Sequence, residues 1–166
     1  MEEKKELSLD LLNEIDKEYE EKEEITVFVK TKDGKVESKL MIDKYFNPTK
    51  IRDCIKELIQ KIDYAKNYIT DDRDQESLYK ILLMLMLVKY FTTLDIPFAF
   101  KKQVAVLEKL SETQVLYQIF SSFNQKEVEK VIDELERFTT ILMKKVDIYQ
   151  PVINEAESNI KSMKKK

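Results

Sequence analysis

The sequence predicts a mainly α-helical protein in which an N-terminal β-hairpin precedes a compact array of about five helices around a central apolar helix. Three observations lead to this fold class. Residues 25–42 alternate apolar and polar side chains around the only glycine, residues 47–149 repeat apolar side chains three and four positions apart, and residues 81–88 are apolar without interruption. Alternation is typical of a strand, and spacings of three and four are typical of an amphipathic helix.

The hairpin over 25–42 is predicted from two β-rich runs separated by Asp33 and Gly34. This pair suits a two-residue turn that needs positive φ. A lone hairpin is marginally stable, so we expect it to pack on helices or to pair with another strand. Its unpaired edges could accept the strand of a neighbouring subunit. The candidate self-association residues are Val27, Val29 and Val36.

Asn47 and Pro48 predict the start of a long helix, because Asn caps helices and Pro suits the first helical position. One face of this helix carries an apolar stripe: Ile51, Ile55, Leu58, Ile62, Ala65 and Ile69. The opposite face is expected to be charged and solvated: Arg52, Lys56, Glu57 and Lys61. Cys54 lies near the edge of the stripe, where we expect a packed and unreactive thiol.

The apolar run 81–88 lies between Lys80 and Lys89. A bilayer needs about twenty such residues, so the run is too short to span a membrane. A helix that is apolar on every side must be surrounded by other elements, and we therefore expect it at the centre of the core. The alternative is an adaptable Met-rich groove, which requires part of the run to be exposed.

Pro97 limits this central helix to residues before it. Phe98 and Phe100 either fold back on the core, which we favour, or stand outside it. The next helix has Val104, Leu107 and Leu110 on one side. A shorter helix over 112–122 is expected to bury four side chains: Val115, Leu116, Ile119 and Phe120.

Asn124 predicts the start of the last long helix. Glu127 could reach back to it in a capping box, and Phe123 could pack on Val128 as a hydrophobic staple. The amphipathic spacing continues to about Asp147. We expect residues 25–149 to form a single domain.

The two ends of the chain lie outside this domain. Residues 1–24 contain eleven acids and four lysines, and they form an acidic arm that is either disordered or a short helix. Such a helix would be capped by Ser8 or Asp10, and the Glu-rich run 18–24 after it is expected to stay solvated. Residues 150–166 form a basic tail.

The composition argues against an enzyme. The chain has no His, one Cys and one Gly. A His base, an intramolecular disulfide, a cysteine metal cluster and a glycine-rich phosphate loop are therefore excluded. The acids of 71–74 fit solvation and capping better than a metal site. The net charge of −3, and the acids on the helix that begins at residue 124, give no attraction to nucleic acid or to a membrane surface. The acidic N-terminus does not resemble a signal peptide, so a cytoplasmic protein without cofactors is expected.

Three segments carry a family resemblance: Tyr45–Ile51 (YFNPTKI), Val88–Pro97 (VKYFTTLDIP) and Phe120–Leu135 (FSSFNQKEVEKVIDEL). Together with the hairpin before them, they resemble small proteins of siphophage and prophage tail modules in low-GC Gram-positive bacteria, which are similar to tail assembly chaperones. The resemblance covers residues 25–145. It implies a non-enzymatic helper in the host cytoplasm that binds the tape measure protein, the major tail protein or both. It also implies a homo-oligomer.

A chaperone of this kind needs an accessible apolar surface. The aromatic segment after the central helix and the helix that follows are the candidates. The expected partner-binding residues are Tyr90, Phe91, Phe98, Phe100, Val104 and Leu107. The alternative reading is a cytosolic helical regulator or adaptor that binds one protein partner.

Overall fold

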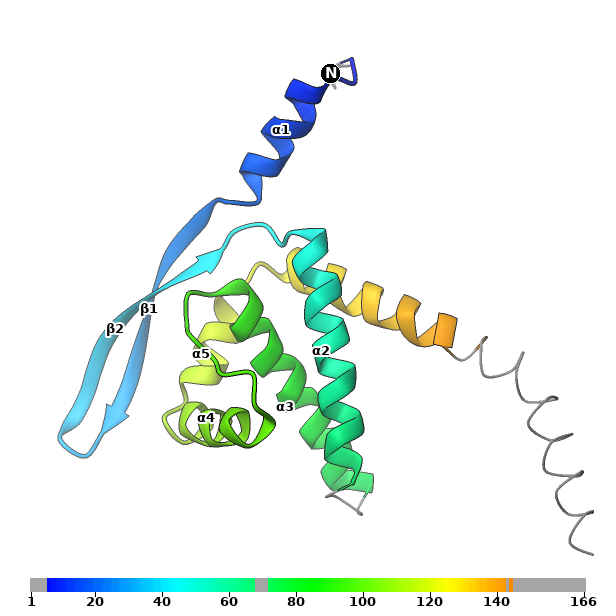
Figure 1. Cartoon of the computed structure of the whole chain (residues 1–166). Coiled ribbons are helices and arrows are strands. Elements are labelled where there is room, and N and C mark those ends of the chain that lie inside the picture. Colours follow the sequence, from blue (N-terminus) through cyan, green and yellow to red (C-terminus); the bar gives the residue numbers. More distant parts are fainter. Residues whose placement is uncertain (1–5, 68–71, 143, 145–166) are drawn as a thin grey trace, which may run out of the picture.

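The structure confirms the predicted fold class. A computed structural model describes residues 6–67, 72–142 and 144 (Figure 1). Within these residues, one helix precedes a two-stranded antiparallel hairpin and five helices follow it. The order is α1 (Leu9–Glu18), β1 (Lys22–Thr31), β2 (Gly34–Asp43), α2 (Pro48–Lys66), α3 (Asp72–Phe91), α4 (Phe100–Glu112), α5 (Val115–Ser122) and a helix over 125–142, hereafter the 125–142 helix.

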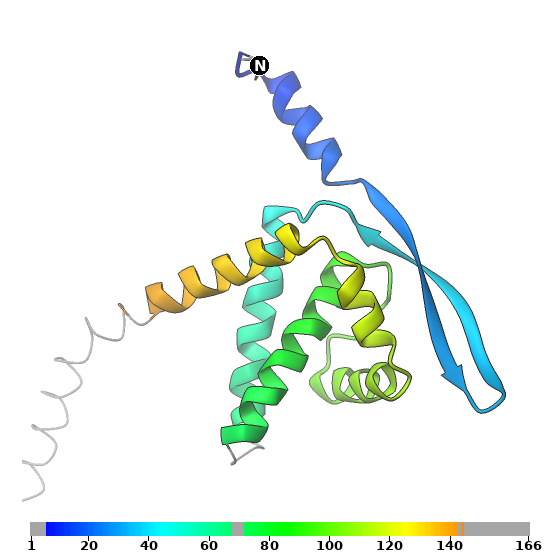
Figure 2. The ribbon, with the colours of Figure 1, turned by 180° about the vertical axis from the view of Figure 1, so that it is seen from behind.

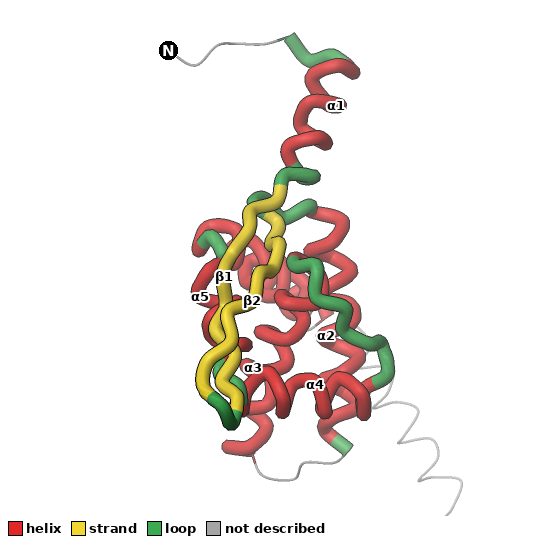
Figure 3. The backbone as a smooth tube through the Cα atoms, turned by 90° about the vertical axis from the view of Figure 1, so that its left-hand side faces the viewer, coloured by secondary structure: helices red, strands yellow, loops and turns green. Residues whose placement is uncertain are grey.

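The acidic arm forms α1, which extends away from the rest of the molecule (Figures 1 and 3). Ser8 caps this helix as predicted, because its hydroxyl accepts a hydrogen bond from the backbone N–H of Leu11 at 3.2 Å. None of the residues of α1 is buried, and Leu9, Leu12 and Ile15 are exposed. The helix therefore has its apolar face in solvent.

The hairpin is longer than the predicted 25–42. Its register runs from Lys22 opposite Asp43 to Thr31 opposite Gly34, so the first strand includes part of the Glu-rich run expected to be solvated. Asp43 explains the extension. Its side chain is 1% exposed and accepts hydrogen bonds from the ammonium groups of Lys22 at 2.6 Å and Lys50 at 2.7 Å. A buried carboxylate needs such partners, and they hold the base of the hairpin on α2.

The turn of the hairpin is displaced by one residue from the prediction. Lys32 and Asp33 are the loop residues, and Gly34 is the first residue of β2. Gly34 has a φ of +131°, while neither loop residue has a positive φ. The only glycine of the chain is thus still the residue that supplies the unusual backbone conformation.

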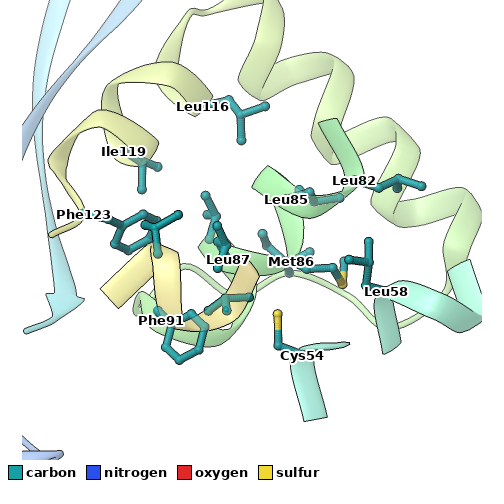
Figure 4. Packing of buried hydrophobic residues seen from close by; sticks show 14 of the residues in the cluster. Cys54, Leu58, Leu82, Leu85, Met86, Leu87, Phe91, Leu116, Ile119 and Phe123 are labelled. Atoms are coloured by element: carbon teal, nitrogen blue, oxygen red, sulfur yellow. The ribbon is translucent and has the colours of Figure 1, made fainter. Parts of the chain in front are cut away.

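The apolar run lies in α3, at the centre of the core, as predicted. Leu82, Leu85, Met86, Leu87 and Val88 have no exposed surface. Side chains of α2 and α5 pack around this helix, and Figure 4 shows Cys54 and Leu58 on one side and Leu116, Ile119 and Phe123 on another. Ile81, Leu83 and Met84 are half-buried and pack against the same core, so none of the run is fully exposed as an open groove requires. On α2, four residues of the predicted stripe are buried, Ile62 is half-buried, and Ile69 lies outside the described residues.

α3 ends at Phe91, earlier than Pro97 requires, because the chain then pairs with the hairpin. Thr92 forms a bridge with Ile42, and the backbone N–H of Thr93 donates to the carbonyl of Met41 at 3.0 Å. α4 and α5 follow, separated by Gln114 with a φ of +61°. This left-handed residue moves the start of α5 from the expected residue 112 to Val115. The predicted burial of Val115, Leu116 and Ile119 is confirmed, and Phe120 is half-buried.

The 125–142 helix begins as predicted, but the capping box is wrong. Asn124 Oδ1 accepts a hydrogen bond from the N–H of Lys126 at 3.0 Å. Glu127 does not reach back to Asn124: it is 4% exposed, and it accepts the backbone N–H of Phe46 at 2.9 Å. Leaving the buried N–H of Phe46 without an acceptor would cost more free energy than the capping hydrogen bond would gain. The side chains of 71–74, the end near Asp147 and the tail 150–166 lie outside the described residues.

Candidate protein-interaction site

Glu57 of α2 lies at a junction with α3 and α4. Its carboxylate accepts hydrogen bonds from Lys89 Nζ at 2.7 Å to each oxygen, from the Tyr90 hydroxyl at 2.7 Å and from Gln103 Nε2 at 2.8 Å. The residue is 4% exposed. Because a buried carboxylate must be paired and hydrogen-bonded, these donors tie three helices to one side chain. We refer to Glu57, Lys61, Lys89, Tyr90 and Gln103 as the Glu57 network.

Ionisation in this network follows from burial and hydrogen bonding. Burial by itself raises the pKa of Glu57, but the hydrogen bonds from Lys89, Tyr90 and Gln103 outweigh it and lower the pKa overall. Burial, and then the hydrogen bond to Glu57, raise the pKa of Tyr90. Glu57 is therefore ionised and Tyr90 is neutral at pH 7. The negative charge of Glu57 thus holds its donors on α3 and α4 against α2.

Cys54 lies close to this network and is fully buried, as expected for a packed thiol. Burial, followed by the negative charge of Glu57, raises its pKa to about 12. The reactive thiolate is therefore scarce at neutral pH. Cys54 is a core residue and has no place in a site.

The Glu57 network holds Phe98 at the surface. Lys61 Nζ donates to the backbone carbonyl of Phe98 at 2.6 Å and lies 4.2 Å from the centroid of its ring. Lys89 Nζ lies 4.9 Å from the same centroid. Two ammonium groups thus lie against one aromatic ring, an arrangement that the ring quadrupole favours.

Phe98 is nevertheless 65% exposed. Beside it is a hollow of ≈ 410 Å³, lined in part by Gln60, Tyr64 and Phe100. The rings of Tyr64 and Phe100 lie 5.1 Å apart, and Tyr64 is 46% exposed. The outer surface is thus aromatic with cationic edges, and its position is set by a buried ionic network. We refer to Phe98, Phe100 and Tyr64 as the aromatic patch.

The structure brings together only part of the predicted partner-binding set. Tyr90 lies in the Glu57 network, and Phe98 and Phe100 lie in the aromatic patch. Val104 is half-buried. Phe91 and Leu107 are 0% and 7% exposed, and they belong to the core. The expectation that both side chains fold back on the core is wrong for Phe98, whose ring lies outside against the cations of Lys61 and Lys89. It is confirmed for Phe100, which is half-buried and packs against the core.

The three candidate self-association residues lie on one face of the hairpin, since they alternate along paired strands. Val27 is 4% exposed and faces the core, and Val29 is half-buried. Val36 is 53% exposed, near the tip of the hairpin. Only Val36 therefore offers substantial apolar surface.

Glu57 and Lys61 were expected on the solvated face of α2, and this expectation is wrong. They are 4% and 7% exposed. A signal was present in the sequence: Cys54, Glu57, Lys61 and Ala65 are three, four and four positions apart, so they share one face of the helix. The small residues Cys54 and Ala65 at the two ends of this row indicate that another helix packs closely against it. The row was missed because Glu and Lys are almost never buried unless they are paired.

Other kinds of site find no support in the described part of the chain. Its residues contain no group of three or more metal-ligating side chains that could hold an ion. None of its helices combines the length and apolar character needed to cross a bilayer.

The fold and this site define a class: a mainly α-helical protein with an N-terminal hairpin and an aromatic surface patch held by a buried ionic network. The YomO family model matches residues 9–166, and the chain belongs to the YomO family. The family takes its name from a prophage-encoded protein of Bacillus, so the family is phage-associated. No curated protein and no solved structure matches it.

Proposed function

We propose that this protein is a non-enzymatic assembly factor of a phage that works by binding other proteins. Its specific role is that of a tail assembly chaperone in the host cytoplasm, with the tape measure protein, the major tail protein or both as clients. The phage association of the family and the resemblance to tail-module proteins support this role. The observation that carries the binding function is the 65% exposure of Phe98 on a fixed support.

An exposed aromatic side chain of this kind suits protein binding for a physical reason. Aromatic residues dominate the energy of many interfaces when they are buried at the centre of the contact. Binding also costs less free energy when the side chain is already ordered. The carbonyl and the ring of Phe98 are both held by lysines, so little of its freedom remains to be lost.

The surroundings of the aromatic patch favour one kind of client segment. Lys61 and Lys101 line the hollow beside Phe98 and Phe100. Charge complementarity selects partners and orients them. The preferred segment therefore presents an apolar side chain to the patch and carboxylates at its edges.

The test is co-purification of the chain with candidate tape measure and major tail proteins from the same genome. We expect Phe98→Asp and Phe100→Asp to weaken client binding at least about 30-fold, as for a central aromatic contact. Tyr117→Asp is the matched control, because Tyr117 is 55% exposed and lies outside the patch. Circular dichroism of each variant checks that the fold is kept.

Unchanged client binding by both Phe variants would refute the role of the patch. Capture of neither tail protein by the wild-type chain, with capture of one unrelated protein instead, would favour the adaptor interpretation.

A further inference from the structure

The outer edges of the hairpin are closed at two points. On β1, the side-chain amide of Gln118 bonds both backbone groups of Phe28: Oε1 accepts the N–H at 2.8 Å, and Nε2 donates to the carbonyl at 2.9 Å. This amide takes the place of a neighbouring strand. On β2, Met41 bonds Thr93 through its N–H and its carbonyl. Toward the tip of the hairpin, β1 is the strand nearer the helices, so this part of the edge of β2 faces away from them (Figures 1 and 2).

The outer edge of β2 is open between Met41 and the tip of the hairpin. In an antiparallel pair, alternate residues direct both backbone groups away from the partner strand. The backbone groups of Met41 point away from β1. Those of Lys35, Glu37 and Lys39, at alternate positions of the same strand, therefore do so too. Their N–H and C=O groups bond to none of the residues that the structure describes. An open stretch of this kind is a template for another strand.

The charges on this stretch alternate in sign. Lys35, Glu37 and Lys39 share one face of the strand and follow Asp33 in the loop. Within the hairpin, Lys35 lies directly opposite Lys30, a like-charge pair that is unfavourable. Lys35 thus has no acidic residue opposite it in its own hairpin, and a strand added at the outer edge could supply one.

We propose that the strand added at this edge is the β2 strand of a second copy of this chain, antiparallel, with Val36 on the two-fold axis. Each Lys35 then lies opposite Glu37 of the other copy, and both residues direct their backbone groups across the new edge. Val36 lies opposite Val36 as a close non-hydrogen-bonded pair, which places two half-exposed apolar side chains in contact. Lys39 also comes level with Asp33 of the other copy.

Other registers are disfavoured by charge or by geometry. With Glu37 on the axis, Glu37 faces Glu37 and Lys35 faces Lys39, so every charged pair repels. With Ser38 on the axis, Lys35 lies opposite Met41, whose backbone groups already bond Thr93. Registers with the axis between two residues bring outward-facing backbone groups against inward-facing ones. Charged edges normally prevent strand addition. Here the order of charges along β2 favours one register of antiparallel pairing between two copies, the one with Val36 on the axis.

Charge reversal tests the proposed pairing on the purified chain, without any client, so its outcome is independent of the proposed function. Sedimentation velocity over a concentration series measures the dimer. We expect Glu37→Lys or Lys35→Glu to weaken it ~10-fold or more, since two attractive pairs become repulsive, and the double variant to restore it. Lys35→Glu removes the repulsion with Lys30, so a loss of dimer cannot be attributed to a damaged hairpin.

Disulfide trapping tests the register. Across the axis, a non-hydrogen-bonded pair has a Cα separation of about 4.5 Å, which a disulfide can bridge. We expect Val36→Cys to form a covalent dimer under mild oxidation and Ser38→Cys to form far less. The native Cys54 is buried and does not compete. A wild-type monomer at all concentrations, a dimer indifferent to both single charge reversals, or preferential trapping at residue 38 would overturn the proposal.

Discussion

The ring of Phe46 is stacked on the ring of Phe91, with centroids 3.7 Å apart and an angle of 8° between the planes. Phe46 precedes α2 and Phe91 ends α3, so the stack joins the entry of one helix to the exit of the other. Phe123 meets Phe46 edge-on at 5.4 Å. Three connections between elements therefore converge on one aromatic cluster in the core.

This cluster leads to the first prediction. Phe91→Ala removes a side chain with no exposed surface, and should lower the free energy of unfolding by about 3–5 kcal/mol. Urea denaturation measures the change. Tyr117→Ala, at an exposed aromatic residue, should stay within about 0.5 kcal/mol of the wild type. Equal effects of the two substitutions would contradict the placement of Phe91 in the core.

The second prediction concerns the Glu57 network. Glu57→Gln keeps the shape of the side chain but leaves Lys89, whose side chain is 17% exposed, without its carboxylate. We expect a loss of about 3 kcal/mol, as for a broken buried ion pair. The control is Glu24→Gln, which breaks the exposed pair with Lys39 and should leave the stability nearly unchanged, because solvent screens such a pair.

The stability difference between the wild type and Glu57→Gln should also depend on pH. The folded-state pKa of Glu57 is lowered, so its contribution is complete above the unfolded-state pKa and is lost as the pH falls through the folded-state pKa. The stability difference between wild type and Glu57→Gln should therefore be constant near neutral pH and shrink below about pH 4.3. Denaturation series from pH 7 to pH 3 measure it. A difference that grows on acidification would be inconsistent with the lowered pKa.

The third prediction concerns the hydrogen bond between Glu127 and the backbone of Phe46. The Glu127 carboxylate accepts the buried N–H of Phe46, 81 positions away in the chain. Glu127→Ala should cost about 1.5–3 kcal/mol, because it removes a charged acceptor of a hydrogen bond. Glu127→Gln keeps an oxygen acceptor and should cost less. If both variants unfolded at the wild-type urea concentration, the bond to Phe46 would not be stabilising.

The fourth prediction concerns the closure of the β1 edge. Gln118→Ala removes both side-chain bonds to the backbone of Phe28. Hydrogen exchange of the Phe28 amide should become faster, while exchange in α3 should not change, since the opening is local. Gln125→Ala, which removes only an exposed side-chain bond to Glu129, is the control. Unaltered exchange at Phe28 would show that Gln118 does not protect this edge.

Much of the fold was predictable because its signals are local. Asn47 caps α2, Ser8 caps α1, and the run 81–88 was assigned to the core from its length and composition. The errors occurred where a distant element changes a local preference. Glu127 bonds the N–H of Phe46 in place of its own helix end, and Gln114 adopts a left-handed conformation that delays α5.

The candidate site was predictable only in part. Phe98 was named as a binding residue, but its exposure depends on Lys61 and Lys89, and Lys61 was expected in solvent. Phe91 and Leu107 appeared equivalent to Phe98 in the sequence and are core residues. Whether an aromatic side chain near a helix end points inward depends on what the neighbouring helices present to it.

The sequence by itself determined the hairpin, the helices and the identity of the central one, because periodicity, caps and the single glycine act over a few neighbouring residues. Only the tertiary structure decided which charges are buried and which aromatic ring is exposed. Glu57 finds Lys89 and Gln103 at separations of 32 and 46 positions. A buried carboxylate is stable only where such donors converge, and convergence is a property of the packed helices.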